Sequence, residues 1–150
     1  MALAEQIQND IKAALLGGDR FVGDTLRGLK AAILNEEVAL GKRDTGLSDT
    51  EIEQIVAREI KKRHESVKLY EANDRPELAE PEKQEITVLE KYLPTQLSEA
   101  ELLVVINEQI TVHGADMSKM GQVIGAVKAQ TGTSADGATI ASLVKQQLSK

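Results

Sequence analysis

Few residues in this sequence have the type and spacing that metal binding or catalysis requires. The chain has no Cys and only two histidines, His64 and His113. The lack of Cys excludes disulfides, thiolate metal ligands and cysteine nucleophiles. Neither histidine has metal-ligand neighbours at a suitable spacing, and the HExxH pattern is absent. We therefore predict no metal site and no cofactor, a solvated His64, and a helix-end His113 that interacts favourably with the helix dipole.

Two other patterns contain the residue types of acid–base or nucleophilic chemistry. One is a run of glutamates interspersed with Lys83 and Lys91, and its members are Glu77, Glu80, Glu82, Glu85 and Glu90. Carboxylates do acid–base work only in a pocket that separates their pKa values, so this mixed run favours a solvated helix face. The other pattern pairs Ser142 with Lys145 as an SxxK match, but the SDN and KTG elements of serine–lysine enzymes are missing. We predict no catalytic residue from either pattern.

The middle of the chain carries a concentration of positive charge. Its basic residues are Arg58, Lys61, Lys62, Arg63 and Lys68, and with Glu59 and Glu65 the local net charge is +3. Such a stripe could contact a phosphate backbone, which makes Arg58, Lys61 and Lys62 candidate nucleic-acid contacts. The alternative is a solvated face with ion pairs within the helix, and the lack of interleaved aromatic residues favours that interpretation.

The elements that must position these residues are helices. Apolar residues recur at steps of three and four along almost the whole chain, whereas no alternating β-branched run occurs beside hairpin turn residues. The first four expected apolar faces are Leu3, Ile7, Ile11 and Leu15; Val22, Leu26, Leu29, Ile33 and Leu40; Ile52, Val56, Ile60, Val67 and Tyr70; and Leu78, Ile86, Leu89 and Leu93. Asp19 is expected to cap the second helix, and capping boxes are expected at residues 48–51 and 98–101. Pro81 predicts a kink or a late start of the fourth helix.

A proline-containing break divides the chain at Pro94. We predict an all-α fold with an N-terminal bundle of long helices in residues 1–94 and a small helical tail domain in residues 95–150. Of the net charge of −6, the first part holds 19 acidic and 14 basic residues, and the second holds 5 and 4. Residues 116–150 contain two acids and four lysines, so a mildly basic segment ends an acidic chain. Aromatic residues make up only 2%, so any nucleic-acid binding has to use backbone and shape contacts rather than base stacking.

The sequence contains no stretch long and apolar enough to span a membrane, and its first residues lack the secretory pattern. We therefore expect a cytoplasmic protein with no membrane partner. Gly121 and Gly125 have the GxxxG spacing but do not lie in an apolar 20-residue stretch. This favours close packing between soluble helices over dimerisation in a membrane.

Over nearly its whole length the sequence resembles the YqeY family, whose members share a tail domain with the GatB subunit of the tRNA-dependent Asp/Glu amidotransferases. The resemblance rests on the segments Leu26–Ile33, Glu59–Arg63, Val88–Ser98 and Met120–Gly125, of which Val88–Ser98 is the most distinctive. Gly28 and Pro81 depart from the family pattern. The resemblance implies an all-α fold, with long helices followed by a small helical tail.

Three functions follow as hypotheses. The leading one is a non-catalytic, tRNA-associated module. Its tail would contact the RNA backbone through Lys119, Lys128 and Lys145, with Gly121 and Gly125 letting a phosphate approach the helix. The second is an adaptor whose N-terminal helices bind a translation-related protein. The third is glutamine-dependent amido transfer or an accessory role in it, because family members are labelled carbon–nitrogen ligases, but the sequence shows no nucleophile paired with a base.

Overall fold

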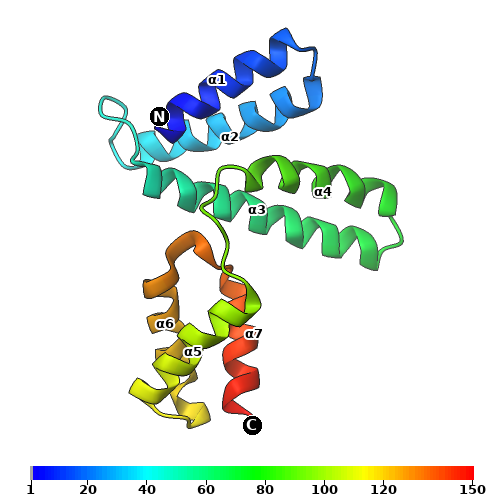
Figure 1. Ribbon diagram of the computed structural model, residues 1–150. Coiled ribbons are helices and arrows are strands. Elements are labelled where there is room, and N and C mark those ends of the chain that lie inside the picture. The colour runs from blue at the N-terminus through cyan, green and yellow to red at the C-terminus, as the bar shows by residue number, and fades with distance from the viewer. Residues whose placement is uncertain (1) are drawn as a thin grey trace. The chain divides into compact units, whose positions relative to one another are not determined.

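Helices form nearly all of the ordered structure. The computed structural model describes residues 2–150, and within that range the chain forms seven α-helices and two short 3₁₀-helices but no strand, which confirms the predicted all-α fold (Figure 1). The elements are α1 (Leu3–Leu16), α2 (Arg20–Ala39), α3 (Asp49–Ala72), α4 (Pro76–Glu90), α5 (Glu99–His113), η1 (Met117–Lys119), α6 (Met120–Thr131), η2 (Gly132–Ser134) and α7 (Gly137–Leu148).

These helices belong to two compact units. The first ends at Leu93 and contains α1–α4, and the second is Pro94–Lys150 and contains α5–α7. Each unit has its own cluster of buried apolar side chains. We call the second unit the tail.

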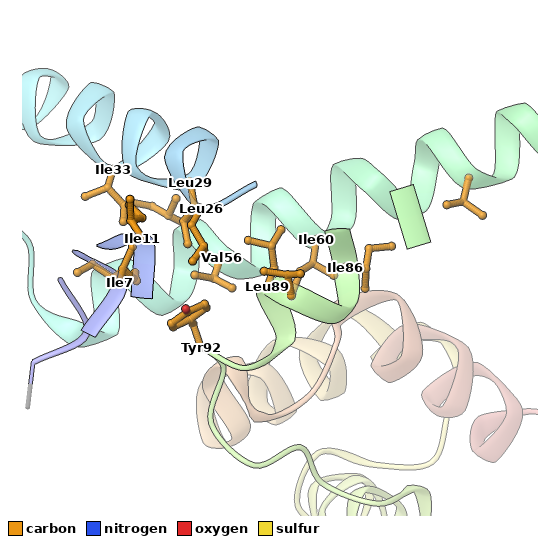
Figure 2. Packing of buried hydrophobic residues seen from close by; sticks show 14 of the residues in the cluster. Ile7, Ile11, Leu26, Leu29, Ile33, Val56, Ile60, Ile86, Leu89 and Tyr92 are labelled. Carbon is orange, nitrogen blue, oxygen red and sulfur yellow. The ribbon is translucent and has the colours of Figure 1, made fainter. Parts of the chain in front are cut away.

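The first unit is built from two helical hairpins. In Figure 1, α1 runs antiparallel to α2 and α3 runs antiparallel to α4, each pair being joined by a short turn. Their apolar faces share one core, part of which Figure 2 shows. The side chains labelled there come from every helix of the unit: Ile7 and Ile11, Leu26, Leu29 and Ile33, Val56 and Ile60, and Ile86 and Leu89, together with Tyr92, which follows α4. Burying each large apolar side chain contributes about 1.5–3 kcal/mol.

The predicted helix starts are confirmed by the cap hydrogen bonds. Asp19 accepts a bond from the N–H of Val22 at the start of α2. Full capping boxes open α3 and α5, where the hydroxyls of Ser48 and Ser98 accept from the N–H groups of Glu51 and Glu101 and the two carboxylates accept in return. A cap of this kind contributes roughly 0.5–2 kcal/mol.

Three leucines that the sequence pattern assigned to the core are exposed instead. Leu15 is 55% exposed and its neighbour Ala14 is buried, while Leu78 is 38% exposed and its neighbour Ala79 is buried. In both cases alanine completes the helical spacing of the buried face, because a small side chain fits where two helices approach closely. Leu40, expected on the apolar face of α2, lies beyond the last residue of that helix and is 49% exposed.

Pro81 does not delay the fourth helix. α4 begins at Pro76 and continues through Pro81 to Glu90, so the predicted late start is wrong. Pro76 occupies the first turn, where its missing N–H leaves no intrahelical bond unmade. Pro81 cannot donate one of the backbone hydrogen bonds of α4. The packing of the buried residues Ala79, Ile86 and Leu89 keeps the helix continuous despite this loss.

The tail packs three helices around a smaller core. Its buried residues are Leu102, Ile106, Val123, Val127, Ile140, Leu143, Val144 and Leu148. α5 ends at Gly114 and α6 ends at Gly132, with φ angles of +108° and +55° respectively. Glycine adopts such angles without the steric cost of a Cβ, so both turns suit this residue.

Candidate nucleic-acid interface

The glycines of α6 lie on an open helix face. Gly121 and Gly125 are exposed, and, apart from the adjoining backbone, no atom of the described chain lies within 4 Å of a Cβ built at either position. The close helix packing expected from the GxxxG spacing therefore does not occur among the described residues of this chain. A glycine inside a helix costs roughly 0.5–1 kcal/mol relative to alanine, and no contact within the described residues offsets that cost here. The backbone of α6 is left accessible to a close approach from outside.

One lysine lies on the same face as the two glycines. Positions 121, 125 and 128 follow the helical spacing i, i+4 and i+7, so Gly121, Gly125 and Lys128 form one ridge along α6. The aliphatic stem of Lys128 also crosses the start of α7, because a Cβ on Gly137 would lie 3.3 Å from its Cε atom. Gly137 thus leaves room for this lysine between the two helices.

The other two predicted tail lysines lie elsewhere on the same unit. Lys119 ends η1, immediately before α6, and Lys145 lies in the last turn of α7. Eight residues separate Gly137 from Lys145, which places Lys145 about 12 Å along α7 from the position that Lys128 reaches. The structure therefore spreads the three lysines over the tail and does not gather them at one point.

The acidic residues of the tail's last segment are used for helix capping. Asp116 accepts a hydrogen bond from the N–H of Ser118, and Asp136 accepts from both the N–H and the hydroxyl of Thr139. The bonds from Ser118 lower the pKa of Asp116. Neither carboxylate forms an ion pair with a lysine among the described residues. The charge of Lys119 also attracts Asp116, whereas the ammonium groups of Lys128 and Lys145 have no carboxylate partner among the described residues and are available to an external anion.

The basic run of α3 has a different environment in the first unit. Arg58 pairs with Glu36 of α2 at 3.4 Å, and Lys62 pairs with Glu59 at 3.0 Å. Lys61 is exposed and has no ion pair within the described chain. Of the three predicted contacts on α3, only Lys61 thus has an uncompensated charge. An arginine or lysine already paired with a carboxylate gains less from a phosphate, because that pair has to be given up.

Sequence reasoning missed a buried ionic cluster in this run. Glu59 is only 9% exposed, and its carboxylate lies 3.4 Å from the guanidinium of Arg63. Arg63 in turn donates from Nε to Glu85 of α4 at 2.7 Å. The sequence feature that could have revealed this cluster is the position of Glu59 on the apolar stripe of α3, because a charge buried there requires a partner. Arg63 is therefore a structural link between α3 and α4 and not a free cation.

Among residues 2–150, no group of three or more histidine and carboxylate side chains is arranged to hold a metal ion. No helix in that range is long and apolar enough to cross a membrane.

Comparison with known proteins decides the family. Residues 4–148 match the family described as Yqey-like protein, which is almost the full length of the chain. The chain belongs to the YqeY-like family. This confirms the resemblance found in its sequence.

Curated relatives of this YqeY-like chain share one name, "Altered inheritance of mitochondria protein 41, mitochondrial". The protein of Kluyveromyces lactis is 31% identical over 86 residues, covering 57% of this chain and 45% of the relative. That of Lachancea thermotolerans is 30% identical over 87 residues (58% and 46%), and that of Clavispora lusitaniae is 25% identical over 92 residues (61% and 52%). The chain spans about half the length of the curated relatives it matches.

These names correct one prediction. The relatives are called mitochondrial, which contradicts the cytoplasmic localisation expected from the sequence. The expectation rested on the lack of a secretory pattern and of a membrane span. Neither observation bears on organelle import, which depends on receptor-read targeting segments of a different composition.

The most distinctive YqeY-like run, Val88–Ser98, has a structural explanation. Tyr92 is 4% exposed and donates its hydroxyl hydrogen bond to Asp10 of α1 at 2.6 Å. On the tail side, Gln96 donates to the carbonyls of Pro94 and Thr133, and the N–H of Leu97 donates to the carbonyl of Ser134. The run therefore anchors the end of the first unit and the start of the tail, each to its own unit.

Proposed function

We propose that this YqeY-like protein is a non-catalytic RNA-binding module, and that its tail contacts the phosphate backbone of tRNA. The observation that carries the proposal is the open glycine ridge of α6. Gly121 and Gly125 expose the helix backbone, and Lys128, on the same ridge of α6, adds a positive charge whose ammonium lies beside Gly137 at the start of α7. A phosphate needs close access and positive charge, and this ridge offers both.

The mode of recognition follows from what surrounds the ridge. The aromatic residues of the chain are Phe21, Tyr70 and Tyr92, and all three lie in the sequence before the tail. Bases consequently have no ring to stack on there, which leaves contacts to phosphates and sugars. Such contacts position a protein on RNA without reading its sequence. We expect binding that is weak, salt-sensitive and tolerant of sequence.

The proposal is tested by fluorescence polarisation with labelled tRNA over a series of salt concentrations. Each phosphate contact contributes about 0.7–0.9 to the slope of log K against log salt, so three lysine contacts give a slope of about −2 to −3. Replacing Lys119, Lys128 and Lys145 by Gln should flatten this slope and weaken binding at low salt. The matched control replaces Lys12 and Lys91, two exposed lysines of the first unit, and should leave the slope unchanged.

The glycine ridge is tested separately with Gly121→Gln and Gly125→Gln. Glutamine is a good helix former and meets open space at both positions, so the variant should fold at least as well as the parent protein. Its longer side chains would keep a phosphate away from the backbone of α6 and weaken tRNA binding. An absence of binding by the parent protein at low ionic strength would overturn the proposal, and so would binding that both sets of variants leave unchanged.

The same salt titration tests which of the candidate phosphate contacts on α3 contribute to binding. Arg58 and Lys62 are held in ion pairs with Glu36 and Glu59, whereas Lys61 is not. We expect Arg58→Gln and Lys62→Gln to change the salt slope less than the replacement of any single tail lysine by Gln does. Lys61→Gln is the matched comparison on the same helix.

A further inference from the structure

Large apolar side chains are exposed at several places in the first unit, and three of them lie at the turn between α1 and α2. Leu15 is 55% exposed, Leu16 is 90% exposed and Phe21 is 37% exposed. Together with Arg20 and Arg27 we call this surface the hairpin tip. Single exposed apolar residues are common on soluble proteins, but a cluster of them marks an interaction site.

A cleft opens beside these side chains. Its volume is about 330 Å³, and it is lined by Ala14, Leu15, Gly18, Arg20, Gly23, Asp24 and Arg27. Gly23 brings α2 close to α1, because a Cβ there would lie 3.7 Å from that of Ala14. The cleft is thus a half-open hollow with an apolar floor, at the small end of the range that binds side chains or ligands.

The rim of the cleft carries two guanidinium groups with spare hydrogen-bonding capacity. Arg20 and Arg27 share one carboxylate, that of Asp24, at 3.8 and 3.7 Å. These distances are too long for hydrogen bonds, and no other ion pair to either arginine occurs among residues 2–150. The side chains are 93% and 53% exposed, so their N–H groups are free to donate hydrogen bonds to carboxylates from outside in forked geometry.

We propose that the hairpin tip binds an acidic amphipathic helix of a partner protein. Leucine-type side chains of that helix would fill the cleft and cover Leu16 and Phe21, while its Asp or Glu residues would pair with Arg20 and Arg27. The charged residues that line the cleft are Arg20, Asp24 and Arg27, so the lining carries one excess positive charge and favours an acidic partner. The exposed apolar side chains favour a helical peptide with one apolar face. A nucleic acid would satisfy the arginines but would leave the leucines exposed to water. This interaction is independent of RNA binding by the tail.

In the test, peptides are selected from a random display library on the 150-residue chain. The affinities of the enriched peptides are then measured by fluorescence polarisation. We expect enriched sequences with apolar residues at i, i+3 or i+4 and i+7, interspersed with Asp and Glu. Leu16→Glu should lower the affinity for these peptides about ten-fold or more, and so should the double variant with Arg20→Glu and Arg27→Glu. The arginine variant should change the salt dependence more than Leu16→Glu does, because it replaces two attractive charges by two repulsive ones.

Matched controls are available in the same unit. Leu69 is 65% exposed on α3 and Arg43 is exposed in the loop before it, so Leu69→Glu and Arg43→Glu should change affinity less than two-fold. Circular dichroism checks that every variant folds. The proposal is overturned if no peptide is enriched, if the enriched peptides are basic, or if they bind Leu16→Glu as well as the parent. It is also overturned if ultracentrifugation shows a dimer that Leu16→Glu dissociates, because the occupant is then a second copy of the chain.

Discussion

At the scale of single residues, the phenol of Tyr92 has a clear energetic role. It is buried and donates a 2.6 Å hydrogen bond to Asp10. Replacing Tyr92 by Phe keeps the ring and removes only this bond. We expect a loss of about 1–2 kcal/mol in the free energy of unfolding of the first unit, because the acceptor is charged. The chain has no Trp, so urea denaturation followed by circular dichroism is the suitable measurement.

The same phenol predicts a pH dependence. Burial and the bond to Asp10 raise the pKa of Tyr92 above its ordinary value of 10.0. The neutral form is favoured in the folded state, so its stabilisation is complete below pH 10 and is lost as the pH rises further. We expect the stability difference between the parent and Tyr92→Phe to narrow as the pH rises from 10 to about 12. A difference that stays constant over this range would contradict the assigned role of the hydroxyl.

Glu51 predicts a second pH dependence of stability, at acidic pH. Its carboxylate accepts hydrogen bonds from the ammonium of Lys42 and from the N–H of Ser48, which lower its pKa from 4.5 to about 2. The charged form is favoured in the folded state, so its stabilisation is present above pH 4.5 and is lost as the pH falls toward 2. Carbon-13 NMR titration should show this low midpoint. Lys42→Gln should raise it toward the ordinary value, whereas Lys12→Gln should leave it unchanged.

At the scale of elements, the open face of α6 predicts a gain in stability. Gly125 lies inside the helix with no neighbour near a built Cβ, so Gly125→Ala should stabilise the tail by about 0.5–1 kcal/mol. Gly121→Ala should give a smaller gain in stability, because Gly121 is the second residue of the helix. Gly132 has a φ of +55°, and Gly132→Ala should therefore destabilise the tail. Hydrogen exchange of core amides in α5 and α7 measures all three effects in the full chain.

The helices themselves could be predicted because their signals are local. The carboxylate of Asp19 reaches an N–H three residues away, and so does the hydroxyl of Ser98, so both caps are visible in a short stretch of sequence. The burial of Ala79 in place of the expected Leu78 was not predictable in this way, because it depends on how closely α4 approaches its neighbours. The pairing of Arg63 with Glu85 of α4 and the empty space around Gly125 depend on the same kind of long-range information.

At the scale of the whole molecule, two separate cores imply separate stability. We propose that the tail is an independently folding domain, since its eight buried residues form a cluster distinct from that of the first unit. Ile106 is fully buried in the tail core, and Ile106→Ala should cost about 2–5 kcal/mol there. In the full chain, hydrogen exchange of amides in α5, α6 and α7 should accelerate, while amides in α3 should keep their protection. Leu29→Ala, in the core of the first unit, should produce the opposite pattern. Equal acceleration in both units by either substitution would show that the two cores unfold as one cooperative structure.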